Sequence, residues 1–466
     1  MANKLPGEVR EVPGDRSQYF RDLLNRFESG GTSYRAHFDG PGRCPVFQSM
    51  DGVYVTDVDG NVYLETFGAY AASCLGYRPK ELIAEVEDQI NSLMHVADMP
   101  NPPRALLAQE LVSIAPGELG QGKVQFEIGG GGAVDLALKL AEYYTPHPQH
   151  DIISFFGGYH GRTIGSVSVA ANVYNRERVP SISAQVVRVP YPYCYRCLFE
   201  KEYPACDMFC TRYLAKLFES PEFGLYDPKT GTNLVSTLIV EPTQFHSGGI
   251  VPPKEFYPRL RELCDKYGIV FVDDEIAIGI GRSGYWFACE AFDTVPDVIV
   301  TSKALSGGIW PLSAVIARRE IFAVWDERPD KHMGTWHGDP VGCRAALTVI
   351  REIKERNLLE RCRMLGGYFL EGLKELQTRH RLVGEVSGIG LGLSMELVKD
   401  RRTKEPAADA TVAVITEALR RGVLICRAAY YGNRMTFMPP YVITREEIDT
   451  ILRVLDESLS IVERGL

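Results

Sequence analysis

Apolar runs and helical stretches alternate through the middle of the chain. Residues 235–242, VSTLIVEP, form a short apolar run typical of a buried strand. Residues 254–268, KEFYPRLRELCDKYG, carry apolar side chains at helical spacing and stop at a glycine. Residues 269–275, IVFVDDE, have the pattern of the next strand. Strand, helix and strand in this order predict a βαβ unit with two parallel strands.

Three further segments contain an apolar run that ends in glycines or polar residues. They are KVQFEIGGGGAVDLALKLAEYY from residue 123, DIISFFGGYHGRT from residue 151 and DVIVTSK from residue 297. In open α/β sheets, ligands bind outside the carboxyl ends of the strands. The sequence therefore predicts an α/β domain with a parallel sheet and a ligand site at that edge.

Both ends of the chain have a different pattern. Residues 51–67 alternate like a hairpin that turns at Asp59-Gly60. From about residue 345, amphipathic helical stretches flank short strands such as GLGLSMEL and RMTFMPP, a pattern that predicts a smaller α+β domain. The predicted division is an N-terminal segment with the hairpin at 1–75, a large domain at 76–340 with a cysteine-containing insertion at about 190–212, and a C-terminal α+β part at 341–466.

Composition and charge exclude some classes of partner. The chain has 466 residues, is 45% hydrophobic and carries a net charge of −9. Because an acidic chain does not neutralise phosphates in bulk, we expect neither nucleic acid nor a membrane surface as a partner. No apolar run approaches the roughly 18 residues that span a bilayer, and no basic-then-apolar leader opens the chain. We therefore expect a cytoplasmic protein.

One group of cysteines has a spacing that could bind metal. Cys194, Cys197, Cys206 and Cys210 form a C-x2-C-x8-C-x3-C pattern. Four thiolates at such a spacing could hold a structural zinc ion. We favour the alternative of a loop with free or locally paired thiols, because the central spacer is shorter than in the usual zinc ribbon.

Lys303 follows an apolar strand pattern and precedes a glycine pair in DVIVTSKALSGGIWP. Partial desolvation at such a strand end would lower the pKa of the ammonium group. A lysine that loses its proton can attack an aldehyde and form a Schiff base. Taken alone, a salt-bridged or snorkelling lysine is the more common case.

Two other strand ends make a cofactor site the better interpretation. Asp273, Asp274 and Glu275 end an apolar strand, and a buried carboxylate there needs a cationic partner such as the ring nitrogen of pyridoxal phosphate. A metal site or a helix cap is the alternative. The run Ile128–Gly132 then opens a helical stretch, where main-chain N–H groups and the helix dipole favour a phosphate.

These segments together resemble the class III aminotransferases, which use pyridoxal 5'-phosphate. The most specific block is FVDDEIAIGIGRSGYWFACEAFDTVPDVIVTSKALSGGIWPLSAVIA, and VEPTQFHSGGIVPP, GGYHGRT, DVDGNVYLE and TWHGDPVGCRAAL match further family patterns. The resemblance runs from about residue 45 to the end. It implies a fold-type I enzyme, with a large α/β domain around a mostly parallel central sheet and a smaller α+β domain built from both chain ends.

The resemblance implies a role for each matching residue. Lys303 would hold the cofactor as a Schiff base and move the proton, and Asp274 would pair with the pyridinium nitrogen. The remaining matches would also contact the cofactor. Tyr159 and Ile276 would lie on its ring faces, Gly130 and Gly131 at its phosphate, and His160 and Glu241 nearby. Thr335 would reach the phosphate from the partner subunit, which implies a homodimer.

Three departures from the family pattern bear on the cofactor and the substrate carboxylate. The loop Gly129–Gly132 lacks the usual hydroxyl and acid, and Ala277 replaces a glutamine that reaches the cofactor. Thr436 stands where several members carry an arginine for the substrate carboxylate. Arg427 and Arg434 are the nearby candidates for that contact, with plain surface charges as the alternative.

His246 is a fourth departure. In the family this position is often small or Glu, and in related amino-acid and lactam racemases it is an Asp that acts as a second acid or base. A histidine titrates near neutrality and could do the same, although a role in shaping the substrate pocket is the simpler interpretation. Tyr70 and Trp336 are further candidates for the substrate pocket.

The sequence leaves three hypotheses open. The leading one is an aminotransferase that moves an amino group from an amine or amino acid to a keto acid or aldehyde through a Lys303 Schiff base. The alternative is a racemase or epimerase that uses Lys303 and His246 as its two bases, and a variant couples transamination to decarboxylation. A non-catalytic binding protein is the third. The sequence does not name the substrate, and it does not distinguish a dimer from a tetramer.

Overall fold

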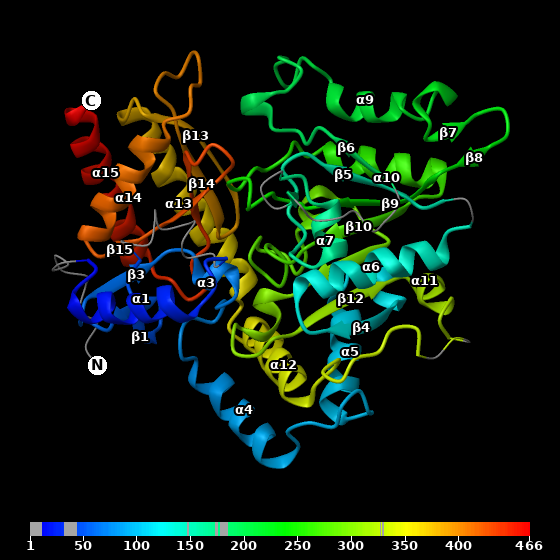
Figure 1. Cartoon of the computed structure of the whole chain (residues 1–466), viewed down its shortest axis with the longest axis horizontal. Coiled ribbons are helices and arrows are strands. Elements are labelled where there is room, and N and C mark those ends of the chain that lie inside the picture. The colour runs from blue at the N-terminus through cyan, green and yellow to red at the C-terminus, as the bar shows by residue number, and fades with distance from the viewer. Residues whose placement is uncertain are drawn as a thin grey trace. The chain divides into compact units, whose positions relative to one another are not determined.

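The computed structural model describes residues 12–31, 44–146, 149–172, 176–177, 185–326, 328 and 330–466. The chain forms two compact units, coloured along the sequence in Figure 1. The smaller unit contains Met1–Lys80, Ser247–Gly249 and Glu360–Leu466, and the larger one contains Glu81–His246 and Ile250–Leu359. The larger unit therefore continues past residue 340, where the sequence pattern predicted the division.

The larger unit is built on a seven-stranded sheet in the order β4-β12-β11-β10-β9-β5-β6. In that order the strands are Lys123–Glu127, Ser313–Ala317, Val298–Thr301, Val270–Asp274, Val235–Val240, Asp151–Phe155 and Val186–Val189. β12 runs antiparallel to both of its neighbours. The five strands from β11 to β6 are parallel. The predicted mostly parallel sheet is confirmed.

Helix α6, Gly130–Tyr144, packs its apolar face on this sheet. Leu136, Ala137 and Leu140 are fully buried in a cluster with side chains from β9 to β12, including Val272 and Val300. Full burial of a leucine contributes about 1.5–3 kcal/mol to stability. The packing therefore fixes the N-terminus of α6 against the carboxyl ends of the strands.

The larger unit also contains several helices, short 3-10 turns and a small hairpin. The helices are α4 (Lys80–Ser92), α5 (Pro102–Ile114), α7 (Ile164–Val169), α9 (Phe209–Lys216), α10 (Phe256–Tyr267), α11 (Arg319–Ala323) and α12 (Pro340–Glu355). Short 3-10 turns occupy Gly117–Gln121, Cys194–Arg196, Pro221–Phe223, Ala288–Phe292 and Lys303–Ser306, and a small hairpin pairs β7 (Tyr226–Asp227) with β8 (Thr232–Asn233). α10 confirms the helix predicted from its spacing, and it ends at Gly268 in the left-handed region with φ 64°.

The smaller unit contains two four-stranded sheets. The first has the order β1-β2-β3-β15, with strands Phe47–Asp51, Tyr54–Asp57, Val62–Glu65 and Val423–Leu424, and it joins the two ends of the chain because β15 pairs with β3. The second has the order β13-β14-β17-β16, with strands Val383–Ile389, Gly392–Leu397, Arg434–Phe437 and Cys426–Ala428. Its helices are α1 (Asp15–Phe27), α3 (Gly68–Ala71), α13 (Leu358–Arg379), α14 (Ala408–Arg420) and α15 (Arg445–Gly465).

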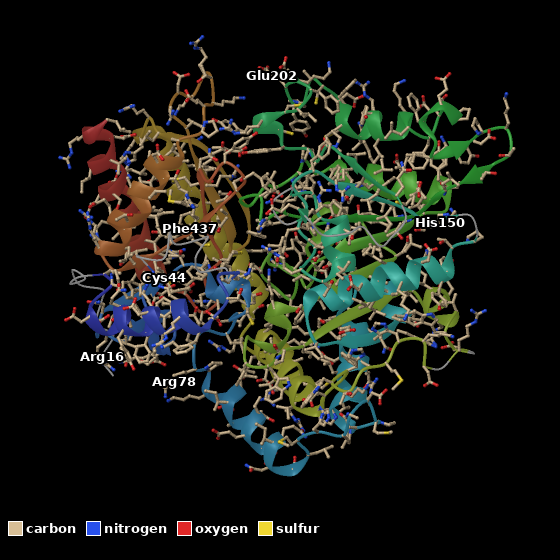
Figure 2. The ribbon with its side chains drawn as sticks, in the orientation of Figure 1. Arg16, Cys44, Arg78, His150, Glu202 and Phe437 are labelled. Carbon is tan, nitrogen blue, oxygen red and sulfur yellow. The ribbon has the colours of Figure 1, made fainter. Side chains whose placement is uncertain are left out.

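Local features of the smaller unit follow from its sequence. β2 and β3 form the predicted hairpin, and the Asp57 carboxylate stabilises the turn by accepting N–H bonds from Asp59 and Asn61 at 3.0 and 2.8 Å. Phe437, labelled in Figure 2, ends β17 and is fully buried. Among the described residues, helices of sufficient length lack the continuous apolar character that a bilayer crossing requires.

Candidate active site

Polar residues gather at one edge of the large sheet, where its parallel strands end. Asp274 is the last residue of β10, and Glu241 directly follows β9. Lys303 lies two residues after β11, and Tyr159 and His160 follow β5. Because these strands are parallel neighbours, their carboxyl ends meet at the same edge. The larger unit thus brings these sequence-predicted residues together.

Asp274 is buried and hydrogen-bonded on both of its oxygens. Its Oδ2 lies 2.7 Å from Nδ1 of His160, and its Oδ1 accepts the N–H of Ile276 at 3.1 Å. Asp274 is 4% exposed and His160 is 2% exposed. A carboxylate oxygen accepts, so this hydrogen bond forms with the His160 tautomer that carries its proton on Nδ1. These contacts hold the carboxylate in one orientation.

Lys303 begins a 3-10 turn with its main chain in the left-handed region, at φ 42°. Part of its side chain still reaches solvent, but burial of the amine is the main reason why its pKa is lowered from the ordinary value. Arg282 adds to the lowering, whereas Asp274 and Glu241 oppose it. A lysine with a lowered pKa supplies more of the neutral amine that attacks carbonyl groups.

The Glu241 carboxyl is a weaker acid than an ordinary glutamate side chain. Burial first, and then repulsion by Asp274, raise the pKa of its carboxyl well above the ordinary value, although Tyr159 and Lys303 oppose the shift. Its Oε1 accepts the N–H of Tyr159 at 2.8 Å. Burial and the nearby Asp274 carboxylate therefore favour the protonated form of Glu241.

Tyr159 and His246 form a stacked pair at the same edge. Their ring centroids lie 4.4 Å apart with an interplanar angle of 24°. Arg162 Nε donates to the Tyr159 hydroxyl at 3.3 Å. The stack places the His246 imidazole next to the ring of Tyr159, a residue whose main-chain N–H is hydrogen-bonded to the Glu241 carboxyl.

The N-terminus of α6 is open to an anion. Its N-cap residue is Gly129, and within the described part of the chain no side chain caps the first turn. A Cβ on Gly130 would lie 2.9 Å from Cδ1 of Ile276, so a larger residue there would push the Ile276 side chain aside. The uncapped N–H groups of a 15-residue helix provide both hydrogen bonds and a favourable dipole for a phosphate.

A buried aspartate, a lysine with a lowered pKa and an uncapped glycine turn at one sheet edge define a class of protein, the pyridoxal-phosphate enzymes of the mostly parallel α/β type. Within that class the chain belongs to the aminotransferase class III family, whose model matches residues 42–459. The family assignment made from the motifs is thereby confirmed.

Named relatives within the family have different activities. The chain is 34% identical to a leucine/methionine racemase of Thermococcus litoralis over 88% of this chain and 89% of that protein. It is 33% identical to a probable 4-aminobutyrate aminotransferase of Bacillus subtilis, over 89% and 91% of the two chains. An amine transaminase from an uncultivated Pseudomonas species, solved with bound pyridoxal phosphate, superposes with a TM-score of 0.83 at 29% identity, over 93% of this chain and 97% of that one.

Pyridoxal phosphate is the cofactor of this family, and the residues present fit it. The α6 N-terminus offers uncapped N–H groups for the phosphate, and the buried Asp274 carboxylate suits a protonated ring nitrogen. Lys303 supplies an amine with a lowered pKa for the aldehyde.

Three of the predicted substrate residues lie in the smaller unit. Tyr70 has a main-chain φ of 59°, and its ring lies 5.4 Å from that of Phe67. Arg427 lies on β16 and is partly exposed. Arg434 is fully buried, and its guanidinium donates to two glutamates and two serines, namely Glu385 at 2.7 Å, Glu396 at 2.8 Å, Ser387 at 3.0 Å and Ser394 at 2.7 Å. This set of internal partners argues against Arg434 as a substrate ligand.

The structure also shows the surroundings of Thr335, Trp336 and the four clustered cysteines. Thr335 and Trp336 are exposed, and Trp336 stacks on His95 with centroids 4.1 Å apart. Within the described part of the chain, Cys194, Cys197, Cys206 and Cys210 are not joined by disulfide bonds. Among the described residues, the groups whose ligand atoms converge within 4.8 Å do not include these four cysteines. A zinc ion on them is therefore not supported by the geometry.

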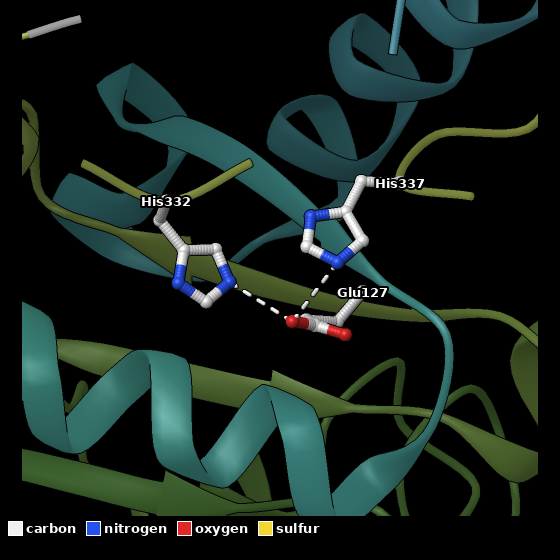
Figure 3. Close-up of side chains that lie close together, drawn as sticks. All are labelled: Glu127, His332 and His337. Atoms are coloured by element: carbon white, nitrogen blue, oxygen red, sulfur yellow. Dashed lines mark hydrogen bonds and ion pairs between the residues drawn. The ribbon is translucent and has the colours of Figure 1, made fainter. Parts of the chain in front are cut away.

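A cluster that the sequence analysis missed lies beside the glycine turn. Glu127 ends β4, and its Oε1 lies 2.9 Å from Nε2 of His332 and 3.1 Å from Nε2 of His337 (Figure 3). The two histidines are about 200 residues away in the chain, so no local pattern indicates the contact. Only the position of Glu127, next to the glycine run, gave a hint.

Proposed function

We propose that this protein is a pyridoxal-phosphate-dependent aminotransferase that moves an amino group from an amine or amino acid to a keto acid or aldehyde. The observation that carries the proposal is that two features lie at the same sheet edge. One is Lys303 with its lowered pKa, and the other is the buried hydrogen bond between Asp274 and His160. When bound, pyridoxal phosphate supplies an electron-accepting ring for the pair of electrons left as a bond at the substrate carbon breaks.

Each residue of the edge has a defined task in this proposal. Lys303 would hold the cofactor through its aldehyde and would also carry a proton at the substrate carbon. Asp274 keeps the ring nitrogen protonated, and His160 orients that carboxylate through the 2.7 Å hydrogen bond. The remaining members bind the cofactor. Tyr159 and Ile276 would lie on the ring faces, Glu241 would also contact the cofactor, and Gly130 and Gly131 would bind the phosphate.

The partner subunit completes the proposed site. We propose a homodimer in which Thr335 of one subunit reaches the cofactor phosphate of the other. The exposed Thr335 hydroxyl on an isolated chain is consistent with such a contact. Thr335→Ala should weaken cofactor binding without changing the oligomeric state, whereas an unchanged cofactor affinity would remove Thr335 from the site.

The test of the reaction follows cofactor absorbance while candidate donors are added without a keto acceptor. Leucine, methionine and 4-aminobutyrate are the first donors to try, because they occur in the names of the relatives described above. A transaminase loses the visible band with its donor and regains it when a keto acid is added. A protein that binds pyridoxal phosphate but never responds to any donor in a broad panel would contradict the proposal.

A second candidate, racemisation or epimerisation, is favoured by His246. Its imidazole stacks on Tyr159, and an imidazole is a side chain that can both accept and donate a proton. Similarity to a racemase also supports it. In D2O without an acceptor, a racemase converts one enantiomer of leucine to the other with deuterium at the α-carbon. His246→Asn should then reduce racemisation far more than any transamination, and an equal loss of both would argue against His246 as the second base.

A further inference from the structure

Glu127, His332 and His337 bring three metal-binding side chains to one point. Both imidazoles approach the same carboxylate oxygen through Nε2, at 2.9 and 3.1 Å (Figure 3). All three donor atoms lie within 4.8 Å of one another. Glu127 comes from the end of β4, and the two histidines come from the segment between α11 and α12.

The donor set and its spacing suit a divalent transition-metal ion. Two imidazoles and a carboxylate form a common ligand set for zinc, with bonds of about 2.0–2.1 Å. A tetrahedral ion with such bonds places its donor atoms about 3.3 Å apart. The observed N–O separations of 2.9 and 3.1 Å differ from that value by a few tenths of an ångström. Small side-chain movements would therefore admit an ion.

Neighbouring groups hold the three side chains in place. The N–H of Ile128 donates to Glu127 Oε2 at 2.9 Å, which turns Oε1 toward the imidazoles. A Cβ on Gly132 would lie 2.8 Å from Oε2, so glycine at this position makes room for the carboxylate. Gln125 donates to the main-chain oxygen of His332 at 3.3 Å. Such supporting contacts restrict the ligands before an ion arrives.

The three side chains are also largely buried. The side chains of Glu127, His332 and His337 are 13%, 14% and 7% exposed. Little solvent therefore competes with these side chains for an ion at this point.

We propose that Glu127, His332 and His337 bind one divalent transition-metal ion, with zinc as the best match to the ligand set. The ion links the end of β4, directly before the Gly129–Gly132 run, to the segment that carries Thr335. It thereby fixes two parts of the chain that border the proposed phosphate site. Metal binding itself does not depend on which reaction the enzyme performs.

The test measures zinc binding to the chelator-treated holoenzyme by equilibrium dialysis and titration calorimetry. The site variants are Glu127→Gln and His337→Asn. His150→Asn is the matched control, because the His150 side chain, labelled in Figure 2, is 43% exposed, lies 3.8 Å from Glu142 and does not belong to the cluster. A double Cys194→Ser, Cys197→Ser variant controls for zinc held by thiols.

We expect one zinc ion per chain, a Kd below about 1 µM, and at least roughly 100-fold weaker binding by each site variant. Both controls should retain wild-type affinity. Unchanged affinity in the site variants, no tight binding by wild type, or loss of zinc in the cysteine variant would each overturn the proposal.

X-ray absorption at the zinc edge tests wild-type protein without relying on variants that fold. Nitrogen and oxygen neighbours alone, at about 2.0 Å, support the Glu127 cluster, and sulfur neighbours at about 2.3 Å overturn it.

Discussion

Mutation of Arg434 tests whether this buried arginine stabilises the sheet as an ion-pair partner. Its guanidinium makes four hydrogen bonds of 2.7–3.0 Å to Glu385, Glu396, Ser387 and Ser394, and both Arg434 and Glu396 are 0% exposed. Arg434→Met removes the cation and leaves the Glu396 carboxylate buried without its charge partner. Breaking a buried ion pair in this way costs about 3–5 kcal/mol.

Hydrogen exchange is the assay suited to this change, because Arg434 lies on β17 and its partners lie on β13 and β14 of the same sheet. A loss of 3–5 kcal/mol in local opening free energy corresponds to exchange faster by roughly a hundred-fold to a few thousand-fold. The double variant Arg434→Met, Glu396→Gln should recover part of the loss, since it also removes the orphaned charge.

A surface pair provides the control for the Arg434 experiment. Arg453 lies 2.9 Å from Glu457 with both side chains largely exposed, so Arg453→Met should change stability by less than about 1 kcal/mol. The structural reasoning would be refuted if Arg434→Met exchanged like wild type while the KM rose for amino acids and stayed constant for amines without a carboxylate. Arg434 would then be a substrate ligand.

Further expected results concern the cofactor site and pH. Lys303→Ala should reduce turnover to below about a thousandth of wild type, measured with the best donor, because it removes both the amine and the proton carrier; retained turnover would contradict its role. Gly130→Val should weaken cofactor binding at least about ten-fold in a fluorescence titration, since its Cβ would lie 2.9 Å from Ile276, whereas Gly129→Ala, with nothing within 4 Å, serves as the control. Burial raises the pKa of Glu65 to about 7 against hydrogen bonds from Gly68 and Phe67. Its protonated form therefore stabilises the fold fully below the unfolded pKa, and this contribution is lost as the pH rises toward 7, by about 3 kcal/mol in total. Denaturant unfolding should show that slope in wild type and lack it in Glu65→Gln, and parallel profiles would refute the assignment.

The sequence predicted the parts of the fold that depend on local patterns. The βαβ unit around α10 and the β2–β3 hairpin followed from apolar runs, a glycine stop and an Asp-Gly turn. The gathering of Lys303, Asp274 and the α6 N-terminus followed from one further rule, that parallel strands end at a common edge. Each of these features can be predicted from residues that are close in the sequence and from the parallel direction of the strands.

Local sequence patterns could not predict the contacts between segments that are far apart in the chain. Arg434 was predicted as a possible substrate ligand, because its partners Glu385 and Glu396 are known only once β13, β14 and β17 pair. Glu127 meets its histidines only when the segment after α11 comes to the end of β4. Neither the spacing of residues in the sequence nor their hydrophobicity predicts these long-range contacts.

Borohydride reduction of the holoenzyme tests directly whether Lys303 holds the aldehyde of pyridoxal phosphate. The reduced holoenzyme is digested and analysed by mass spectrometry. We expect a phosphopyridoxyl group on Lys303, and we expect its loss when a reactive amino donor is added before the reduction. A label on another lysine, or a holoenzyme without any label, would show that Lys303 does not hold the cofactor.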